Sequence, residues 1–236
     1  MSAEGIVRTD DRPTTLKTRI IGDNQHIARV DREKIAYVNG LLLQRLIERF
    51  ELLFEQSAAI ILEDYNKGVL AKDLITHVVK RARENNKPVL VDPKFINFLE
   101  YRHVTVFKPN VRETVHALGK PVSSDRDVEL AGQELLELLQ ADCVLITRGG
   151  RGMSLIEMGK TPRHIPTRTR QVADVSGAGD TVISTMAAAL VGGATFPEAA
   201  TMANYAAGLV CEEVGIVPVN RDELFNKLKQ DKLQNA

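Results

Sequence analysis

The chain has 236 residues with 31 basic and 31 acidic side chains, so its formal net charge is zero. That length fits one α/β domain, and a hydrophobic content of 44% is enough for a buried core. The neutral balance gives no support for nucleic acid or a membrane surface as a partner, and no apolar run reaches the roughly 18 residues that cross a bilayer. Cys143 and Cys211 stand apart among apolar neighbours, which indicates buried thiols of a cytoplasmic protein.

The N-terminal region predicts an antiparallel hairpin. Residues 14–21 and 25–30 have the composition of strands, and 22–24 form a Gly-Asp-Asn turn. Many of the hairpin side chains are polar, so we expect a flap over a binding site. From Asn39, a suitable N-cap, leucine and phenylalanine recur at helical spacing as far as Phe54.

The rest of the chain alternates between short apolar runs and amphipathic segments. Buried parallel strands are predicted at 58–62, 89–91, 104–107 and 143–146. Helices are predicted up to Asn86 and over 110–119, 124–138, 177–191 and 197–214, with a last one from Asn220. This alternation is typical of a doubly wound α/β sheet flanked by helices. Ligands of such sheets bind beyond the carboxyl ends of the strands, where this chain places Asp64 and Lys67, Asp92 and Lys94, and Lys108 and Asn110.

The segment from Asp174 to Asp180, with the sequence DVSGAGD, precedes a long apolar run of helix-forming character. Gly177 and Gly179 carry no Cβ, so the backbone can turn sharply and approach another molecule closely. A helix that begins there presents free N–H groups and the positive end of its dipole, which together attract an anion such as phosphate. Asp180 falls in the first turn, where a carboxylate can take a proton from a hydroxyl as a phosphoryl group arrives. An acid in a first helical turn is also an ordinary stabilising feature.

Two other phosphate-binding motifs fail. Gly159-Lys160-Thr161 is similar to the end of a P-loop, but Ser154 occupies the position of the first glycine and no helix follows. The dinucleotide fingerprint fails because Val182 occupies the position of its third glycine.

Four motifs in order resemble those of the ribokinase-like (PfkB-type) sugar kinases. The segment 174–180 resembles the second signature of that family, and Asn110-Val111-Arg112-Glu113 its Asn-x-x-Glu motif. Residues 147–152, TRGGRG, resemble its nucleotide loop, and 203–208, ANYAAG, the helix beside its adenine pocket. The resemblance implies a ribokinase-like doubly wound, mostly parallel sheet with a small β-hairpin lid, and ATP with Mg²⁺ as the phosphoryl donor.

The resemblance also implies a role for each motif. Asp180 is the expected base, and the amides of Gly177, Ala178 and Gly179 are expected to hold the charge on the transferred group. The expected ATP-binding residues are Asn110, Val111, Arg112, Glu113, Thr147, Gly149, Gly152, Asn204 and Gly208. Glu113 is the expected Mg²⁺ ligand, through water. The expected sugar-phosphate residues are Asp64, Lys67, Lys94 and Arg29, and the three cations among them can equally be solvated surface charges.

One branch of the family fits best. Residues 12–19, 64–68 and 92–94 resemble those of D-glycero-β-D-manno-heptose-7-phosphate kinases, which implies phosphorylation at C1 on the route to ADP-heptose and lipopolysaccharide. Family members carry a Gly-Asp substrate motif ahead of the hairpin, and because this sequence has none we expect residues 1–236 to be an N-terminally incomplete kinase domain, with 14–30 as its lid. Lids of this family often pair between subunits, which implies a homodimer. The alternatives are a kinase for another sugar or sugar phosphate, and a non-catalytic nucleotide-binding fragment that needs a partner chain.

Overall fold

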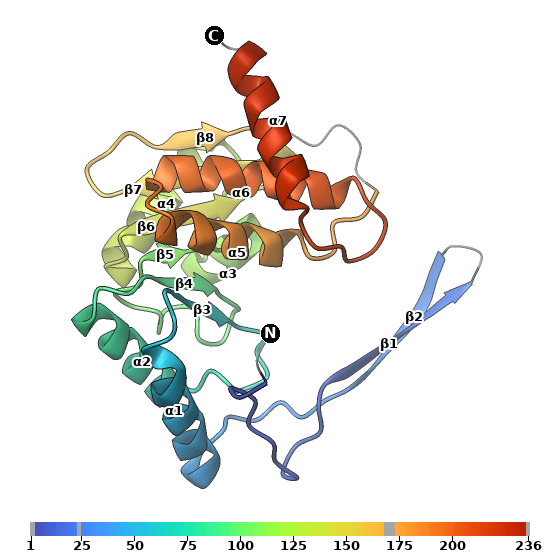
Figure 1. Cartoon of the computed structure of the whole chain (residues 1–236), viewed down its shortest axis with the longest axis vertical. Helices are drawn as coiled ribbons and strands as arrows, with labels where there is room; N and C mark the ends of the chain where they lie inside the picture. The colour runs from blue at the N-terminus through green and yellow to red at the C-terminus, as the bar shows by residue number, and fades with distance from the viewer. Residues whose placement is uncertain (1–2, 23–24, 168–172, 235–236) are drawn as a thin grey trace.

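The computed structural model of the chain describes residues 3–22, 25–167 and 173–234. A six-stranded sheet in the order β3-β4-β5-β6-β7-β8 forms its centre (Figure 1). The strands are β3 (Ile60–Glu63), β4 (Val89–Asp92), β5 (Val106–Phe107), β6 (Cys143–Thr147), β7 (Met153–Glu157) and β8 (Arg163–Ile165). β3 to β6 run parallel, and β7 and β8 are antiparallel to their neighbours. The predicted mostly parallel sheet is confirmed.

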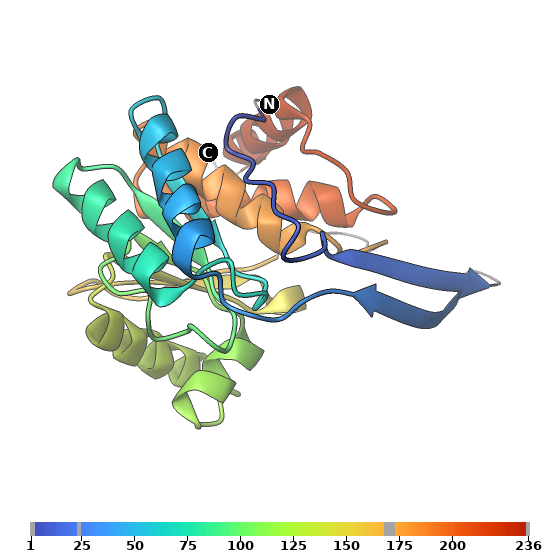
Figure 2. The same cartoon turned by 90° about the horizontal axis from the view of Figure 1, so that it is seen from below.

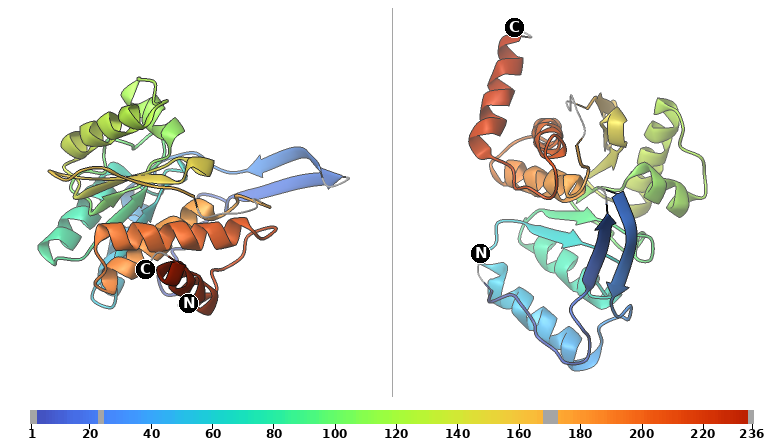
Figure 3. Two further views of the ribbon diagram at one scale, coloured as in Figure 1. Left: turned by 90° about the horizontal axis from the view of Figure 1, so that it is seen from above. Right: turned by 90° about the vertical axis from the view of Figure 1, so that its right-hand side faces the viewer.

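Helices cover both faces of this sheet, which explains why the inner strands are apolar without interruption. The helices of one face are α1 (Gly40–Phe54), α2 (Lys72–Glu84), α3 (Val111–Leu118) and α4 (Asp125–Leu139). The other face holds α5 (Ala178–Val191) and α6 (Phe196–Cys211), and α7 (Arg221–Gln234) follows. Along β4, Val89 and Val91 join the first core while Leu90 joins the second, because successive strand side chains point to opposite faces. Figure 3 shows α4 and α6 on opposite sides of the sheet.

The predicted hairpin is present and projects from the body of the protein (Figures 1 and 2). It consists of β1 (Leu16–Gly22) and β2 (Gln25–Arg32), which pair antiparallel with Thr18 opposite Val30. Residues 23–24 of the predicted turn lie outside the described residues.

The expectation of a fully buried first strand was wrong. β3 is an edge strand of the sheet formed by the described residues, and Ile61 is 39% exposed. Asn39 does occupy the N-cap position of α1, but its side chain makes no capping hydrogen bond. None of the helices built from described residues is long and apolar enough to cross a membrane.

Candidate active site

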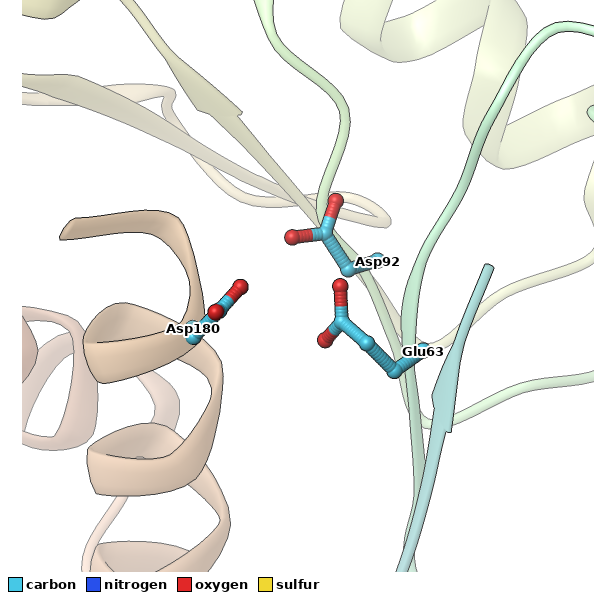
Figure 4. Close-up of side chains that lie close together, drawn as sticks. All are labelled: Glu63, Asp92 and Asp180. Carbon is cyan, nitrogen blue, oxygen red and sulfur yellow. The ribbon is translucent and has the colours of Figure 1, made fainter. Parts of the chain in front are cut away.

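The carboxyl ends of the parallel strands meet the start of α5 at one edge of the sheet. Glu63 ends β3, Asp92 ends β4, and Asp180 lies in the first turn of α5. One carboxylate oxygen of each residue lies within 4.8 Å of one oxygen of each of the other two, and the three side chains point toward one another in Figure 4. Three segments far apart in the sequence therefore supply one acidic cluster, at the end of the sheet where ligands of such folds bind.

The start of α5 has the open geometry that the glycines predict. Gly177 is the N-cap at a φ of +80°, in the left-handed region that glycine adopts without strain. The Ala178 N–H donates to the carbonyl of Val175 at 3.3 Å, so this amide is only weakly engaged. Asp180 is exposed, so its carboxylate is accessible from solvent.

Lys108 follows β5 and lies against the acidic cluster. It is only 3% exposed, and its Nζ donates to Asp92 Oδ2 at 2.7 Å. The sequence places Lys108 at a strand end but does not predict a role for it. The available signal was a lysine directly after a buried apolar strand, where a charge needs a partner.

Glu63, to which we also gave no role from the sequence, binds its proton unusually tightly. Burial raises the pKa of Glu63, the nearby charges of Asp92 and Asp180 raise it further, and Lys108 and Lys94 oppose them, leaving a pKa of about 8. Glu63 is therefore mostly protonated at neutral pH, which relieves repulsion among three close carboxylates.

The Asn-x-x-Glu motif begins α3 and forms a capping box. Asn110 Oδ1 accepts from the Glu113 N–H at 2.9 Å, and Glu113 Oε2 accepts from the Asn110 N–H at 2.8 Å. The other oxygen of Glu113 accepts from Lys94 Nζ at 2.7 Å, and Glu113 is only 3% exposed. With both oxygens engaged, Glu113 fits Mg²⁺ through a water molecule better than by direct ligation. Asp92 Oδ2 is likewise engaged, by Lys108, which leaves Glu63 and Asp180 as the oxygen donors of the acidic cluster for Mg²⁺.

Lys94 forms ion pairs with two carboxylates of this region. Burial lowers the pKa of Lys94, but the hydrogen bond to Glu113 and the charge of Asp92 outweigh it and raise the pKa above its ordinary value. Lys94 therefore stays charged and bridges Glu113 to Asp92, whose Oδ1 lies 3.6 Å away. Its predicted contact with the sugar phosphate would compete with these two carboxylates.

A cavity of about 880 Å³ borders the acidic cluster. Its walls are residues 6–10 and 12–15, Lys17 at the base of the hairpin, and residues of the segment 63–70 at the end of β3 and after it. Glu63 lines the cavity and belongs to the acidic cluster, so the cavity and the cluster share this side chain. The cationic side chains in the cavity wall are Arg8, Arg12, Lys17 and Lys67. Lys67 is also ion-paired with Glu33.

Asp64 lines the same cavity, but its carboxylate is bound from inside the protein. Oδ1 accepts from the Asn66 N–H at 2.7 Å, and Oδ2 accepts from the Tyr101 hydroxyl at 2.6 Å and from Asn97 Nδ2 at 3.4 Å. Asp64 is only 2% exposed. It anchors the turn that carries Lys67, and its predicted contact with substrate stays a prediction.

Arg29 is not among the residues that line the cavity. It lies on β2, where its Nε is 3.1 Å from Asp31 Oδ1 and its side chain is 56% exposed. Of the four predicted sugar-phosphate residues, the structure brings Asp64 and Lys67 to the cavity and Lys94 to the acidic region.

Two of the predicted nucleotide residues, Gly152 and Asn204, contact the chain at the end of β8. Thr147 ends β6 and bridges to Asn110, and Gly149 begins a 3₁₀ turn that leads to Gly152. A methyl group at Gly152, whose φ is +80°, would lie 2.0 Å from the Ile165 carbonyl oxygen, so only glycine fits. Asn204 of α6 is 4% exposed and donates to the Pro166 carbonyl at 2.7 Å.

The remaining three predicted nucleotide residues differ in exposure. Gly208 is buried in α6. Val111 packs against the core and Arg112 is exposed. The contacts of all nine predicted nucleotide residues with ATP stay predictions.

The sheet order and the glycine-rich start of α5 beside a carboxylate are those of one class of proteins. This protein has the fold of the ribokinase-like kinases. The sequence profile of the pfkB family of carbohydrate kinases matches residues 2–222. The chain therefore belongs to that family.

Relatives named bifunctional protein HldE are similar to the chain over almost all of its length. The relative from Paramagnetospirillum magneticum is 41% identical over 97% of this chain and 47% of its own length. The relative from Geobacter sulfurreducens is 38% identical over 95% of this chain and 46% of its own length. The chain thus spans about half the length of the curated relatives it matches.

Solved structures support the fold. Arabidopsis thaliana ribokinase complexed with ribose and ATP has a TM-score of 0.72 at 20% identity, over 94% of this chain and 73% of that chain. Thermotoga maritima ribokinase has a TM-score of 0.71 at 23% identity, over 92% of this chain and 70% of that chain. At these identities the likeness establishes the fold alone.

Proposed function

We propose that this protein transfers the γ-phosphoryl group of ATP to C1 of D-glycero-D-manno-heptose 7-phosphate, giving the 1,7-bisphosphate for ADP-heptose and lipopolysaccharide core synthesis in the cytoplasm. The observation that carries the proposal is a cavity that has Arg8, Arg12, Lys17 and Lys67 in its wall and shares Glu63 with the acidic cluster beside the start of α5. A sugar phosphate matches both features, because its phosphate needs positive partners and its hydroxyl needs a base. Similarity to the HldE relatives supports the choice of heptose.

In this mechanism Asp180 accepts the proton of the C1 hydroxyl. A bond forms between that oxygen and the γ-phosphorus, the bond from phosphorus to the bridging oxygen breaks, and ADP leaves with the electron pair. The amides of Gly177, Ala178 and Gly179 donate to the oxygens of the transferred group, and Ala178 gives up its weak bond to Val175. Bound Mg²⁺ would neutralise charge on the ATP phosphates, with Glu113 reaching it through water.

The cavity suggests how the 7-phosphate is held. Lys67 has its predicted role as a partner of this phosphate, and Arg8, Arg12 and Lys17 join it from the N-terminal segment and the hairpin. The hairpin is a lid whose base forms one wall of the cavity, so its closure would exclude water from the sugar. Residues 1–236 belong to one kinase domain in this proposal, with 14–30 as its lid.

The hairpin is also the proposed contact between two copies of the chain. Leu16, Ile20, Ile27 and Val30 are 47 to 69% exposed on it, and an isolated two-stranded hairpin is marginally stable in water. Val30→Glu should shift the protein toward monomer in sedimentation velocity runs. Arg29→Glu, which alters the opposite face of the same strand, is the matched control. Equal effects of the two substitutions would exclude this interface.

The substitution Asp180→Asn tests the mechanism. It should lower kcat by roughly 10²- to 10⁴-fold and leave ATP affinity nearly unchanged, because only the base is lost. Asp73→Asn, in the first turn of α2, is the matched control and should keep kcat. A surviving kcat in Asp180→Asn would place the base elsewhere.

A substrate panel tests the choice of sugar. It compares heptose 7-phosphate with hexose phosphates and with unphosphorylated sugars. Preference for another sugar would overturn the heptose assignment. ATP binding without turnover on any sugar would favour a nucleotide-binding fragment that needs a partner chain.

A further inference from the structure

Lys108 is a buried cation that the mechanism above leaves without a role. Its side chain is 4% exposed and that of its partner Asp92 is 8% exposed, with 2.7 Å between Nζ and Oδ2. Most lysines of a folded protein keep their ammonium group in water. The position of Lys108 therefore needs a physical reason.

Stability gives no sufficient reason for a buried ion pair. Removing two charges from water is costly, and apolar side chains of similar volume are often as stabilising. Lys108 follows β5 directly, and its neighbours on the strand, Val106 and Phe107, are fully buried. An apolar side chain at position 108 would continue that pattern, so the lysine points to a function.

The start of α5 lies against this ion pair. A methyl group at position 179 would lie 3.5 Å from Lys108 Nζ and 3.5 Å from Asp92 Oδ2. The ammonium group is thus next to the backbone of the glycine-rich turn, where its charge adds to the positive end of the α5 dipole and the equally close Asp92 carboxylate opposes it. Burial weakens solvent screening, so this charge acts more strongly than a surface lysine would.

We propose that Lys108 is a positioning residue for phosphoryl transfer: Asp92 holds its ammonium group under the first turn of α5, where it keeps the anion-binding backbone positively polarised. This inference rests on the proposed role of the α5 start, but not on the identity of the sugar. In the transition state charge is redistributed over the oxygens of the transferred group and the leaving oxygen, so the fixed cation acts on kcat more than on ATP binding.

The test compares Asp92→Asn with the double variant Asp92→Asn/Lys108→Met, and both with wild type. The double variant replaces the ion pair by neutral side chains of similar size, so it leaves no unpaired buried carboxylate. The steady-state rate of ATP hydrolysis without sugar gives kcat and the KM for ATP. Thermal unfolding confirms that each variant is folded.

We expect the double variant to hydrolyse ATP with a kcat roughly 10- to 100-fold below that of Asp92→Asn, and a KM for ATP within about threefold. The matched control is Lys120→Met/Glu134→Gln, which removes an exposed ion pair of the same 2.7 Å length and should keep kcat. Equal kcat values for Asp92→Asn and the double variant would overturn the proposal, because Lys108 would then only neutralise Asp92.

A binding measurement compares Asp92→Asn with the double variant without requiring turnover. Calorimetry with ADP, Mg²⁺ and aluminium fluoride, a mimic of the transferred group, should show weaker binding to the double variant by the same factor, with binding of ADP alone unchanged. Equal affinity of all variants for the mimic would also overturn the proposal. Wild-type hydrolysis of ATP without phosphorylation of heptose 7-phosphate would reject the proposed sugar but leave both comparisons valid.

Discussion

Replacing Tyr101 by phenylalanine tests whether the buried Asp64 network holds the wall of the cavity. The substitution removes one hydroxyl and keeps the ring, which packs against Phe107 at 6.3 Å between centroids. Tyr101 is fully buried and Asp64 is 2% exposed, so no solvent replaces the lost donor. The change isolates one hydrogen bond between residues that are far apart in the sequence.

The expected cost follows from the geometry. The lost bond is short, at 2.6 Å, and Oδ2 of Asp64 would keep only the long contact to Asn97 Nδ2 at 3.4 Å. Hydrogen bonds to charged groups contribute about 1.5 to 3 kcal/mol, and leaving a buried acceptor unpaired carries the full desolvation penalty. We expect a loss of about 2 to 3 kcal/mol in the free energy of unfolding, or roughly 4 to 12 °C in Tm for a chain of this size.

Urea unfolding followed by circular dichroism measures this free energy. Tyr65→Phe makes the same chemical change at a side chain that is 55% exposed, and should alter stability by less than about 0.5 kcal/mol. Asp64→Asn combined with Tyr101→Phe should cost less than the sum of the two single changes, because they share one bond. A Tyr101→Phe protein with the urea midpoint of wild type would refute the reasoning.

Two further predictions concern stability. The pKa of Glu63 is about 8 in the folded protein, and its reference value is 4.5. Between these two pH values the native state binds more protons than the unfolded state, so the free energy of unfolding of wild type falls as pH rises through this range. Glu63→Gln should therefore stabilise the protein more at pH 8.5 than at pH 5 in urea unfolding, and equal gains would contradict this. Gly152→Ala should cost more than about 2 kcal/mol, since its methyl group would meet the Ile165 carbonyl oxygen at 2.0 Å and its φ is +80°. Gly150→Ala, which meets open space, should cost far less in the same assay.

The architecture could be predicted from the sequence because its signals are local. Uninterrupted apolar runs such as 143–146 predict a strand that is buried on both faces, and the amphipathic segment after Asn39 predicts a helix with one face on the core and one in solvent. The start of α5 could also be predicted from local signals, because Gly177 can adopt a positive φ and Asp180 follows in the first turn.

The exposure of β3 could not be predicted in this way. Its apolar run is the same signal that a central strand gives, and only the sheet order shows that it lies at an edge among the described residues. Likewise, a charge at a strand end predicts nearness to the site but not its partner. Asp64 turned out to bind Tyr101, and Lys94 to bind Glu113.

By itself the sequence determined the order of strands and helices, the family of sugar kinases, and the glycine-rich turn that carries Asp180. The tertiary structure alone decided that Glu63, Asp92 and Asp180 meet, that Lys108 lies beneath Gly179, and that a cavity lies beside them. The physical reason is that backbone conformation depends mainly on neighbouring residues, whereas the partners of a buried charge depend on strand register and on which helix packs above the strand ends.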